Sequence, residues 1–216
     1  MIIAIDGPAA AGKGTLAQNL AKHFHYAFLD TGRLYRAVGY AVLQAGKDPA
    51  DEEAAVGEAK KLKPESINKL LENPALREEA SGEAASKVAV IPAVRAALLD
   101  LQRDFARNPF FVDGSAAKGA VLDGRDIGTV VCPDADFKFF VTASPEVRAT
   151  RRFKELQERG ENPDYDTILK DVKARDERDS NRAAAPLKAA DDAKILDTSD
   201  MNAEQAYQHA LDMMVP

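Results

Sequence analysis

The sequence predicts an α/β fold, with a parallel sheet covered by helices on both faces. Short apolar runs alternate with longer segments whose apolar residues recur at helical spacing. The first such run, IIAID at residues 2–6, leads through a glycine-bounded loop into a helix-like segment that begins at Lys13. Strands that alternate with helices are joined by crossovers and pair in parallel. Such a sheet binds its ligands at the carboxyl ends of its strands.

Each element follows from local composition. The expected strands are residues 2–6, 26–30, 110–113, 120–123, 136–141 and 193–197. Amphipathic spacing and caps predict helices over residues 13–24, 31–42, 94–105, 145–159, 164–181 and 203–214. Residues 46–86 are rich in Lys, Glu and Ala and are broken by prolines, so short helices are expected there. Run 110–113 is expected as an edge strand or hairpin partner, joined to run 120–123 by a polar loop.

Composition limits the class of protein. The 216 residues suit one domain with small inserted lobes, and the net charge of −6 argues against general nucleic-acid binding. The single Cys132 indicates a reducing compartment, and we expect its thiol to be packed in the core. The chain starts with a core strand rather than a signal peptide, and no apolar run approaches the ~20 residues of a membrane span. We therefore expect a cytoplasmic protein with no membrane contact.

The loop after the first strand carries the strongest chemical signal. Gly7 and Gly12 permit positive φ and close backbone approach, so successive N–H groups can face an anion. The helix N-terminus adds its own N–H groups, and Lys13 adds a mobile charge. A plain glycine-rich turn is the alternative. In loops of this kind a Ser or Thr usually follows the lysine directly, whereas here Gly14 follows Lys13 and the hydroxyl group comes at Thr15. The sequence therefore leaves open whether the loop itself binds Mg²⁺.

Charged residues follow the fourth run. Asp123 stands at a strand end, where an acid can hold Mg²⁺ directly or through water, although a lone Asp there can also form a turn. Arg125 and Asp126 come next, and they could instead cap the following turn. Asp123 and Thr15 are thus the candidate metal-linked residues.

Half of the fourteen arginines lie between residues 148 and 182, in the two predicted helices or directly after the second. Arg175, Arg178, Asp179 and Arg182 share one helix face, as do Arg148, Arg151 and Arg152. Such faces are usually solvated and paired with acids. Two arginine-bearing helices joined by a Gly/Asn/Pro hinge also suit a lid that closes over phosphates and excludes water.

Five segments together resemble bacterial cytidylate kinases, a family of P-loop nucleoside monophosphate kinases. They are GPAAAGKGT at 7–15, LDTGRLYR at 29–36, EAASKVAVIPAVR at 83–95, LDGRDIGTVV at 122–131 and RDERDSNRAAAPL at 175–187. The resemblance implies a three-layer α/β/α kinase with a central parallel sheet. The expected core is residues 1–30, 96–147 and 183–216, the acceptor-nucleotide lobe 31–95 and the lid 148–182. The segments run in the family's order from one end of the chain to the other.

The resemblance also implies roles for single residues. The ATP phosphates would lie on Gly7, Pro8, Ala9, Ala10, Ala11, Gly12, Lys13, Gly14 and Thr15. The catalytic charges would be Lys13, Arg125, Arg182 and Asp123. The acceptor nucleotide would contact Thr31, Arg36, Ser86, Arg95, Arg125, Asp126, Arg175, Asp179 and Arg182. Within that set, Ser86, Arg95 and Asp126 would bind the cytosine edge, although Ser86 could be a helix cap and Arg95 a solvated residue. Arg148, Arg151, Arg152 and Arg178 would belong to the lid.

The expected activity is ATP-dependent phosphorylation of CMP and dCMP to their diphosphates, in pyrimidine nucleotide metabolism. ATP and Mg²⁺ are the expected cofactors, small nucleotides are the expected partners, and no protein partner is inferred. A kinase for UMP or another small acceptor is an alternative, and a nucleotide-dependent switch is a more distant one. The sequence departs from the family in the short, helix-like residues 62–82 and in loop 111–119, for which we assign no function.

Overall fold

The computed structural model describes residues 1–215, apart from the side chains of residues 65, 66, 68 and 69. The chain divides into two compact units. The first consists of Met1–Phe24 and the chain from Asp123 onward, and the second is His25–Leu122. These boundaries do not coincide with the division into core, acceptor lobe and lid, which stays a prediction.

The sheet of the first unit is parallel, as the crossover pattern requires. Strand β1 (Ile2–Asp6) pairs with β4 (Phe137–Thr142), with Ile3 opposite Phe137. On its other side β4 pairs with β5 (Lys194–Asp197). The strand order in the sheet is β2 (Ala27–Asp30), β3 (Ala120–Gly124), β1, β4 and β5. The interiors of β1 and β3 are buried, in keeping with their continuous apolar runs.

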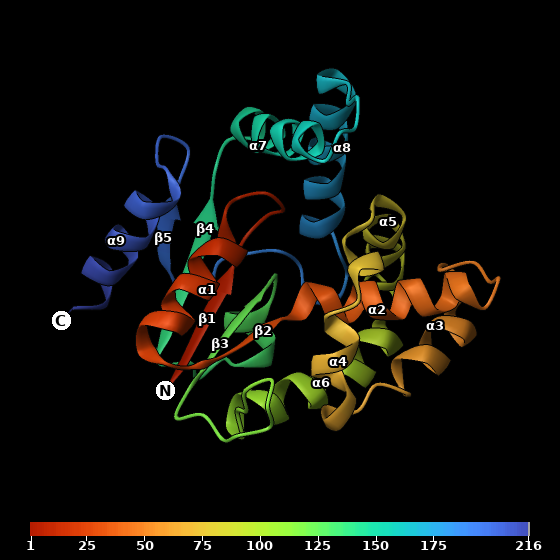
Figure 1. Ribbon diagram of the computed structural model, residues 1–216, viewed down its shortest axis with the longest axis horizontal. Coiled ribbons are helices and arrows are strands. Elements are labelled where there is room, and N and C mark those ends of the chain that lie inside the picture. The colour runs from red at the N-terminus through yellow and green to blue at the C-terminus, as the bar shows by residue number, and fades with distance from the viewer. Residues whose placement is uncertain (216) are drawn as a thin grey trace. The chain divides into compact units, whose positions relative to one another are not determined.

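Two helices of the first unit pack beside its strands (Figure 1). Helix α1 (Lys13–Phe24) buries Leu16, Ala17, Leu20 and Ala21, the helical spacing that the sequence shows. Helix α9 (Ala203–Met214) packs on α1 and β5, and it begins with a capping box between Asn202 and Gln205. The α/β architecture with a central parallel sheet is therefore confirmed.

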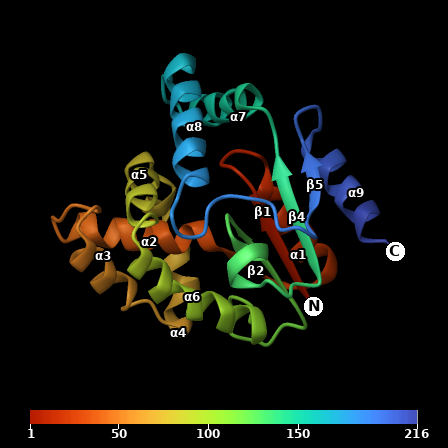
Figure 2. The ribbon, with the colours of Figure 1, turned by 180° about the vertical axis from the view of Figure 1, so that it is seen from behind.

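The arginine-rich helices form a hairpin with a small core of its own. Helix α7 (Pro145–Glu158) starts at the Ser144 cap, and α8 (Tyr165–Ser180) starts at the Asp164 cap. Figure 2 shows the two helices side by side. Their shared buried side chains are Ala149, Leu156, Ile168 and Val172. The two predicted helices and the break at residues 160–163 are confirmed, but α8 ends at Ser180, so Arg182 lies beyond the helix on whose face it was expected.

The second unit is mostly helical. Its elements are β2 (Ala27–Asp30), α2 (Thr31–Gln44), α3 (Glu52–Ala59), α4 (Pro64–Leu71), the 3₁₀ turn η1 (Pro74–Arg77), α5 (Glu79–Val88), α6 (Pro92–Arg107) and the first residues of β3. Helices α2 and α5 approach closely, because a Cβ on Gly39 would lie 2.7 Å from the Ala84 Cβ. The short helices expected over residues 46–86 are confirmed.

The strand expected at residues 110–113 is absent from the described structure, and that prediction is wrong. Phe110 instead makes a single antiparallel bridge to Ala116, and the Phe111 N–H donates to the Ser115 carbonyl (2.8 Å). Asp113 accepts from both the N–H and the hydroxyl of Ser115, and Gly114 has φ +83°. Local turn chemistry therefore closes the segment on itself.

In the described part of the chain, none of the helices combines the length and apolar character needed to cross a bilayer.

Candidate functional site

The loop between β1 and α1 has a backbone that only particular residues can adopt. Gly7 has φ +143°, and a Cβ at this position would lie 1.9 Å from the Val141 carbonyl oxygen. Gly12 has φ +90° and Ala10, although not a glycine, has φ +59°. Positive φ at a non-glycine residue is uncommon and concentrates at functional sites. Glycine adopts the backbone conformations required at residues 7 and 12, whereas Ala10 is held in a conformation that is unfavourable for alanine.

Side chains bond the carbonyl oxygens of the loop. Lys13 Nζ donates to the Pro8 carbonyl (2.9 Å), and an Arg148 Nη donates to the Ala9 carbonyl (3.3 Å). The Thr198 hydroxyl lies 3.0 Å from the Ala11 carbonyl. Fixing the carbonyls through these donors favours an arrangement in which the N–H groups face a bound anion.

Lys13 and Asp123 meet at the start of α1. Lys13 Nζ lies 3.8 Å from Asp123 Oδ1, and the residues are only 5% and 7% exposed. Asp123 also faces Gly14, where a Cβ would be 3.4 Å from Oδ2. A carboxylate beside a helix N-terminus and an ammonium group supplies the oxygen donor that a Mg²⁺–phosphate complex uses. Among the described residues, no three His, Cys, Asp or Glu side chains cluster so as to hold a metal.

Asp6, the last residue of β1, is a second buried carboxylate. Its two oxygens accept from the backbone N–H groups of Ile127 (2.8 Å) and Gly128 (2.7 Å), in the helical turn η2 (Ile127–Val131). Burial, with smaller contributions from Asp126 and Asp123, raises the pKa of Asp6 to about 6, although the two hydrogen bonds oppose this shift. In the sequence, Asp6 is recognisable only as the end of a strand.

Asp179 on α8 pairs with two of the arginines that are predicted to contact the acceptor nucleotide. Arg125 Nε donates to its Oδ2 (3.2 Å), and Arg182 pairs with its Oδ1. Burial alone would raise the pKa of Asp179, but the charges of Arg125, Arg182 and Arg175 hold it below the ordinary value. The three arginines of this cluster thus share one buried counter-ion.

The four predicted lid arginines differ in their surroundings. Arg148 is buried, with Nε bonded to the Ala143 carbonyl (2.9 Å) and the guanidinium paired with Asp176 on α8. Arg152 pairs with Glu155 on its own helix, and Arg178 is exposed. Arg148 therefore braces the hairpin against the loop after β1, whereas Arg178 faces solvent.

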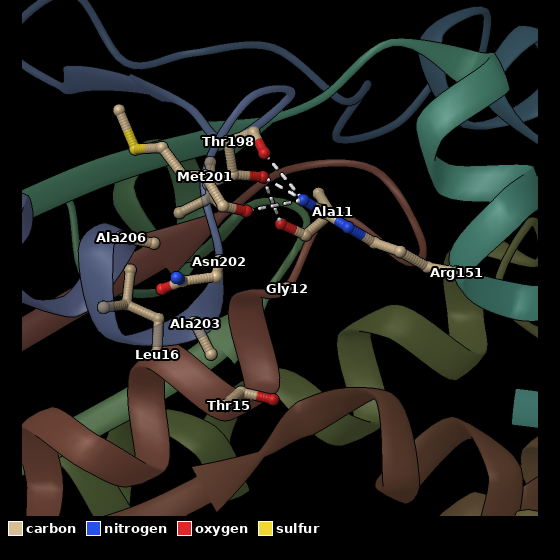
Figure 3. A pocket seen from close by; sticks show the side chains of 11 residues that line it. Ala11, Gly12, Thr15, Leu16, Arg151, Thr198, Met201, Asn202, Ala203 and Ala206 are labelled. Carbon is tan, nitrogen blue, oxygen red and sulfur yellow. Dashed lines mark hydrogen bonds between the residues drawn. The ribbon is translucent and has the colours of Figure 1, made fainter. Parts of the chain in front are cut away.

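Arg151 borders a cavity of about 210 Å³ beside the loop (Figure 3). Its guanidinium donates to the Thr198 hydroxyl (3.0 Å) and to the carbonyls of Thr198 (2.6 Å) and Met201 (3.3 Å). The lining residues are Ala11, Gly12, Thr15, Leu16, Val141, Arg151, Thr198, Met201, Asn202, Ala203 and Ala206. Much of this lining comes from the segment after β5, where the sequence carries no motif that could have revealed it.

In the second unit, predicted acceptor residues line the α2–α5 contact. An Arg36 Nη donates to the carbonyls of Leu76 (2.9 Å) and Glu78 (3.2 Å) and faces Gly82, where a Cβ would be 3.1 Å away. Ser86 lies one turn beyond Gly82 on the same face of α5, inside the helix and not at its cap. Arg36 and Ser86 thus flank the same helix surface.

Two further acceptor candidates border the same helix pair. Arg95 on α6 lies over the Tyr35 ring, 5.4 Å from its centroid, and an Nη donates to the Ala89 carbonyl (3.2 Å). Thr31 is buried at the first position of α2. Arg95 is therefore an ordered side chain rather than a solvated one.

The family model for cytidylate kinase matches residues 3–215. This chain belongs to the cytidylate kinase family. It is 57% identical over 214 residues to the cytidylate kinase of Rhodospirillum rubrum, covering 99% of this chain and 97% of that protein. It is 58% identical over 211 residues to that of Azorhizobium caulinodans, covering 98% and 96%. The resemblance that the five sequence segments indicated is confirmed.

One solved structure has a similar fold. An uncharacterised protein from Eubacterium ventriosum has a similar structure, with a TM-score of 0.54 at 14% identity, over 99% of this chain and 98% of that one. At that identity the likeness concerns the fold alone. For this cytidylate kinase family member, the individual site residues stay predictions, now with defined surroundings.

Proposed function

We propose that this member of the cytidylate kinase family transfers the γ-phosphoryl group of ATP to CMP and dCMP, forming CDP and dCDP. The observation that carries the proposal is the β1–α1 loop, with its positive-φ backbone and buried Lys13 beside Asp123. In a chain of this family, such a loop is suited to the triphosphate of the donor.

The donor nucleotide is assigned to the first unit. The triphosphate lies on residues 7–15, and the cavity beside Thr15 and Arg151 takes the base. Its lining combines small side chains with the larger apolar Leu16, Val141 and Met201, which suits a flat ring. The bonds from Arg151 to the 198–201 segment hold the rim of the cavity in place.

The acceptor phosphate is assigned to Arg36, Arg125 and Arg182. Asp179 holds Arg125 and Arg182 in place before a ligand arrives, which reduces the reorganisation needed when the phosphate binds. Ser86, Arg95 and Asp126 are assigned to the cytosine edge, whose amino group suits a carboxylate or hydroxyl and whose O2 and N3 suit an arginine. Arg175 and Asp179 are assigned to the sugar, and Thr31 lies near the acceptor.

Asp123, directly or through water, and Thr15 are the residues that would hold Mg²⁺ beside the ATP phosphates. When bound, the ion neutralises charge on the transferring phosphoryl group. Asp123 is suitably placed at the start of α1, whereas Thr15 lines the cavity.

The transfer needs no nucleophile from the protein, because an oxygen of the acceptor phosphate attacks in line. Lys13 gives up its hydrogen bond to the Pro8 carbonyl and contacts the transferring phosphoryl group. Lys13, Arg125 and Arg182 together stabilise the negative charge that spreads over this group during transfer. The α7–α8 hairpin acts as the lid that excludes water. The core role is assigned to residues 1–30, 96–147 and 183–216, the acceptor-lobe role to 31–95 and the lid role to 148–182.

The cytoplasm is the proposed compartment, because the single buried Cys132 fits a reducing environment.

Phosphoryl transfer from labelled ATP tests the function directly. CMP and dCMP are expected to be phosphorylated with Mg²⁺ present, and UMP, AMP and GMP much more slowly. Preference for UMP or a metabolite alcohol would replace the acceptor. ATP hydrolysis that no monophosphate stimulates would instead favour a nucleotide-dependent switch.

Asp126→Ala tests the base assignment. The KM for CMP should rise by about 10-fold or more, because a buried carboxylate that bonds the base is removed, while the KM for ATP changes little. Asp134→Asn, at an exposed loop position, is the control and should behave as the wild type. An unchanged KM for CMP would remove Asp126 from the base site.

A further inference from the structure

Asp6 makes an unusual long-range contact between two loops of the first unit. It is 4% exposed, and each of its two oxygens accepts a main-chain N–H from consecutive residues. These residues, Ile127 and Gly128, lie more than a hundred positions away in the sequence. The side chain joins the strand end before the phosphate-binding loop to the turn after β3.

The contact serves as the N-terminal cap of η2. The N-cap residue of this turn is Asp126, whose side chain makes no capping hydrogen bond. The first N–H groups of a helical turn need acceptors, which an N-cap side chain usually provides. Here the carboxylate of Asp6, on β1, accepts the hydrogen bonds of these N–H groups. The carboxylate of Asp126 therefore does not cap the turn.

Packing around the turn leaves little room for an alternative arrangement. A Cβ on Gly128 would lie 3.2 Å from Lys138 Cδ and 3.4 Å from Asp6 Oδ2. The absence of a side chain at residue 128 therefore lets the turn settle between Asp6 and Lys138. Arg125 and Asp126 immediately precede these fixed amides, so their backbone positions depend on the same two hydrogen bonds.

The charge on Asp6 is costly for the folded chain. The side chain is buried close to Asp126 and Asp123, and its pKa is raised to about 6, mainly by burial. An uncharged side chain of the same shape would avoid that cost. A carboxylate at such a position is consistent with a requirement other than stability.

We propose that Asp6 is a positioning residue, whose two main-chain hydrogen bonds set Arg125 and Asp126 for acceptor binding. The inference rests on the proposed function, because those two residues are assigned to the acceptor there. It adds a residue that no motif assigned to the acceptor and that touches neither nucleotide. In effect, the strand that carries the donor loop also fixes the turn that binds the acceptor.

Asp6→Asn in the full-length enzyme tests the proposal. The amide has the same shape, but it can accept only one of the two N–H groups and turns an N–H toward the other. Loss of a hydrogen bond to a charged group corresponds to about a 10- to 100-fold rise in the KM for CMP. The KM for ATP should stay near the wild-type value, while the thermal midpoint should fall by a few degrees, because one buried N–H loses its acceptor.

Asp136→Asn is the matched control. Asp136 also accepts a main-chain N–H of β1, from Ile2 (2.6 Å), but at the opposite end of that strand from the turn. This variant should leave both KM values unchanged. Amide hydrogen exchange without nucleotide gives an independent readout, since exchange at Ile127 and Gly128 should accelerate in Asp6→Asn and not in Asp136→Asn.

Each remaining outcome contradicts a specific claim. If exchange accelerates while the KM for CMP is unchanged, Asp6 shapes the turn without serving the acceptor, and the inference fails. If both KM values rise alike or the fold collapses, the role is structural and the inference also fails. A wild-type protein that does not phosphorylate CMP would overturn the proposed function, whatever the exchange of Asp6→Asn shows.

Discussion

At the scale of single residues, the start of the phosphate-binding loop requires a residue without a side chain at position 7. Gly7 combines φ +143° with a carbonyl oxygen 1.9 Å from where its Cβ would stand. That oxygen belongs to Val141 in a buried strand, so it cannot move aside without disturbing the β1–β4 pairing. Both backbone strain and steric overlap therefore oppose any side chain here.

Gly7→Ala should consequently lower the free energy of unfolding by about 3 kcal/mol or more, or prevent folding. Gly46→Ala is the control, since Gly46 also has positive φ (+69°) but has no atom within 4 Å of its Cβ position. That substitution should cost only the strain, about 1 kcal/mol. Denaturant titration measures both values. Equal losses would show that the overlap with Val141 is relieved cheaply.

Asp6 gives the stability an unusual pH dependence. Because burial raises its pKa from 3.8 to about 6, the folded state binds more protons than the unfolded state between these values. The contribution of Asp6 to the free energy of unfolding is thus fully present below pH 3.8 and is lost as the pH rises through 6. Relative to Asp6→Asn, the wild type should lose about 3 kcal/mol over that window. A stability difference that stays constant with pH would contradict this.

At the scale of elements, the α7–α8 hairpin shows what helical periodicity can and cannot predict. The caps at Ser144 and Asp164 and the arginine faces were all readable from spacing. The spacing of residues shows which side chains share a helix face, but it does not show what that face contacts. It could not show that Arg148 is buried against Asp176 and the donor loop, or that Arg151 bonds the segment after β5.

The hairpin rests on a small apolar cluster, which should make it locally less stable than the sheet region. Leu156→Ala removes one of four buried members of that cluster and should cost about 2 kcal/mol, near the lower end for such changes. Leu20→Ala, in a fully buried position of α1, should cost about 3–5 kcal/mol. Hydrogen exchange in Leu156→Ala should accelerate in α7 and α8 alone. Acceleration throughout the first unit would instead show that the hairpin unfolds only with the rest.

At the scale of the whole molecule, the predicted site residues are divided between the two units. The sequence predicted the parallel sheet, the donor loop and the arginines because each has a local pattern. It missed the cavity lined by Thr198 and Met201 and the hydrogen bonds of Asp6 to the turn after β3, because those depend on which distant segments meet. The strand expected at residues 110–113 failed for the opposite reason, since a local turn there overrode an apolar run.

The slowing of amide hydrogen exchange by bound nucleotides should show how the site residues are divided between the two units. ATP alone should slow amide exchange in the loop before α1 and in residues 198–203, within the first unit. CMP alone should slow exchange in α2 and α5 of the second unit and around Asp126. At 100-fold excess over its Kd, either ligand should add about 2.7 kcal/mol to the stability of the state it binds. Protection of the same segments by both nucleotides would contradict separate donor and acceptor sites.

The first unit is built from the two ends of the chain, and this has a consequence for its synthesis. Strand β1 leaves the ribosome well before its partner β4, because Phe137 follows Ile3 by more than a hundred residues. At ~5–20 residues per second, the apolar β1 waits on the order of ten seconds for its partner, while the whole of His25–Leu122 emerges. The inserted unit can therefore fold co-translationally before the sheet of the first unit exists. Until β4 emerges, the apolar strand β1 is exposed to mispairing and to capture by chaperones.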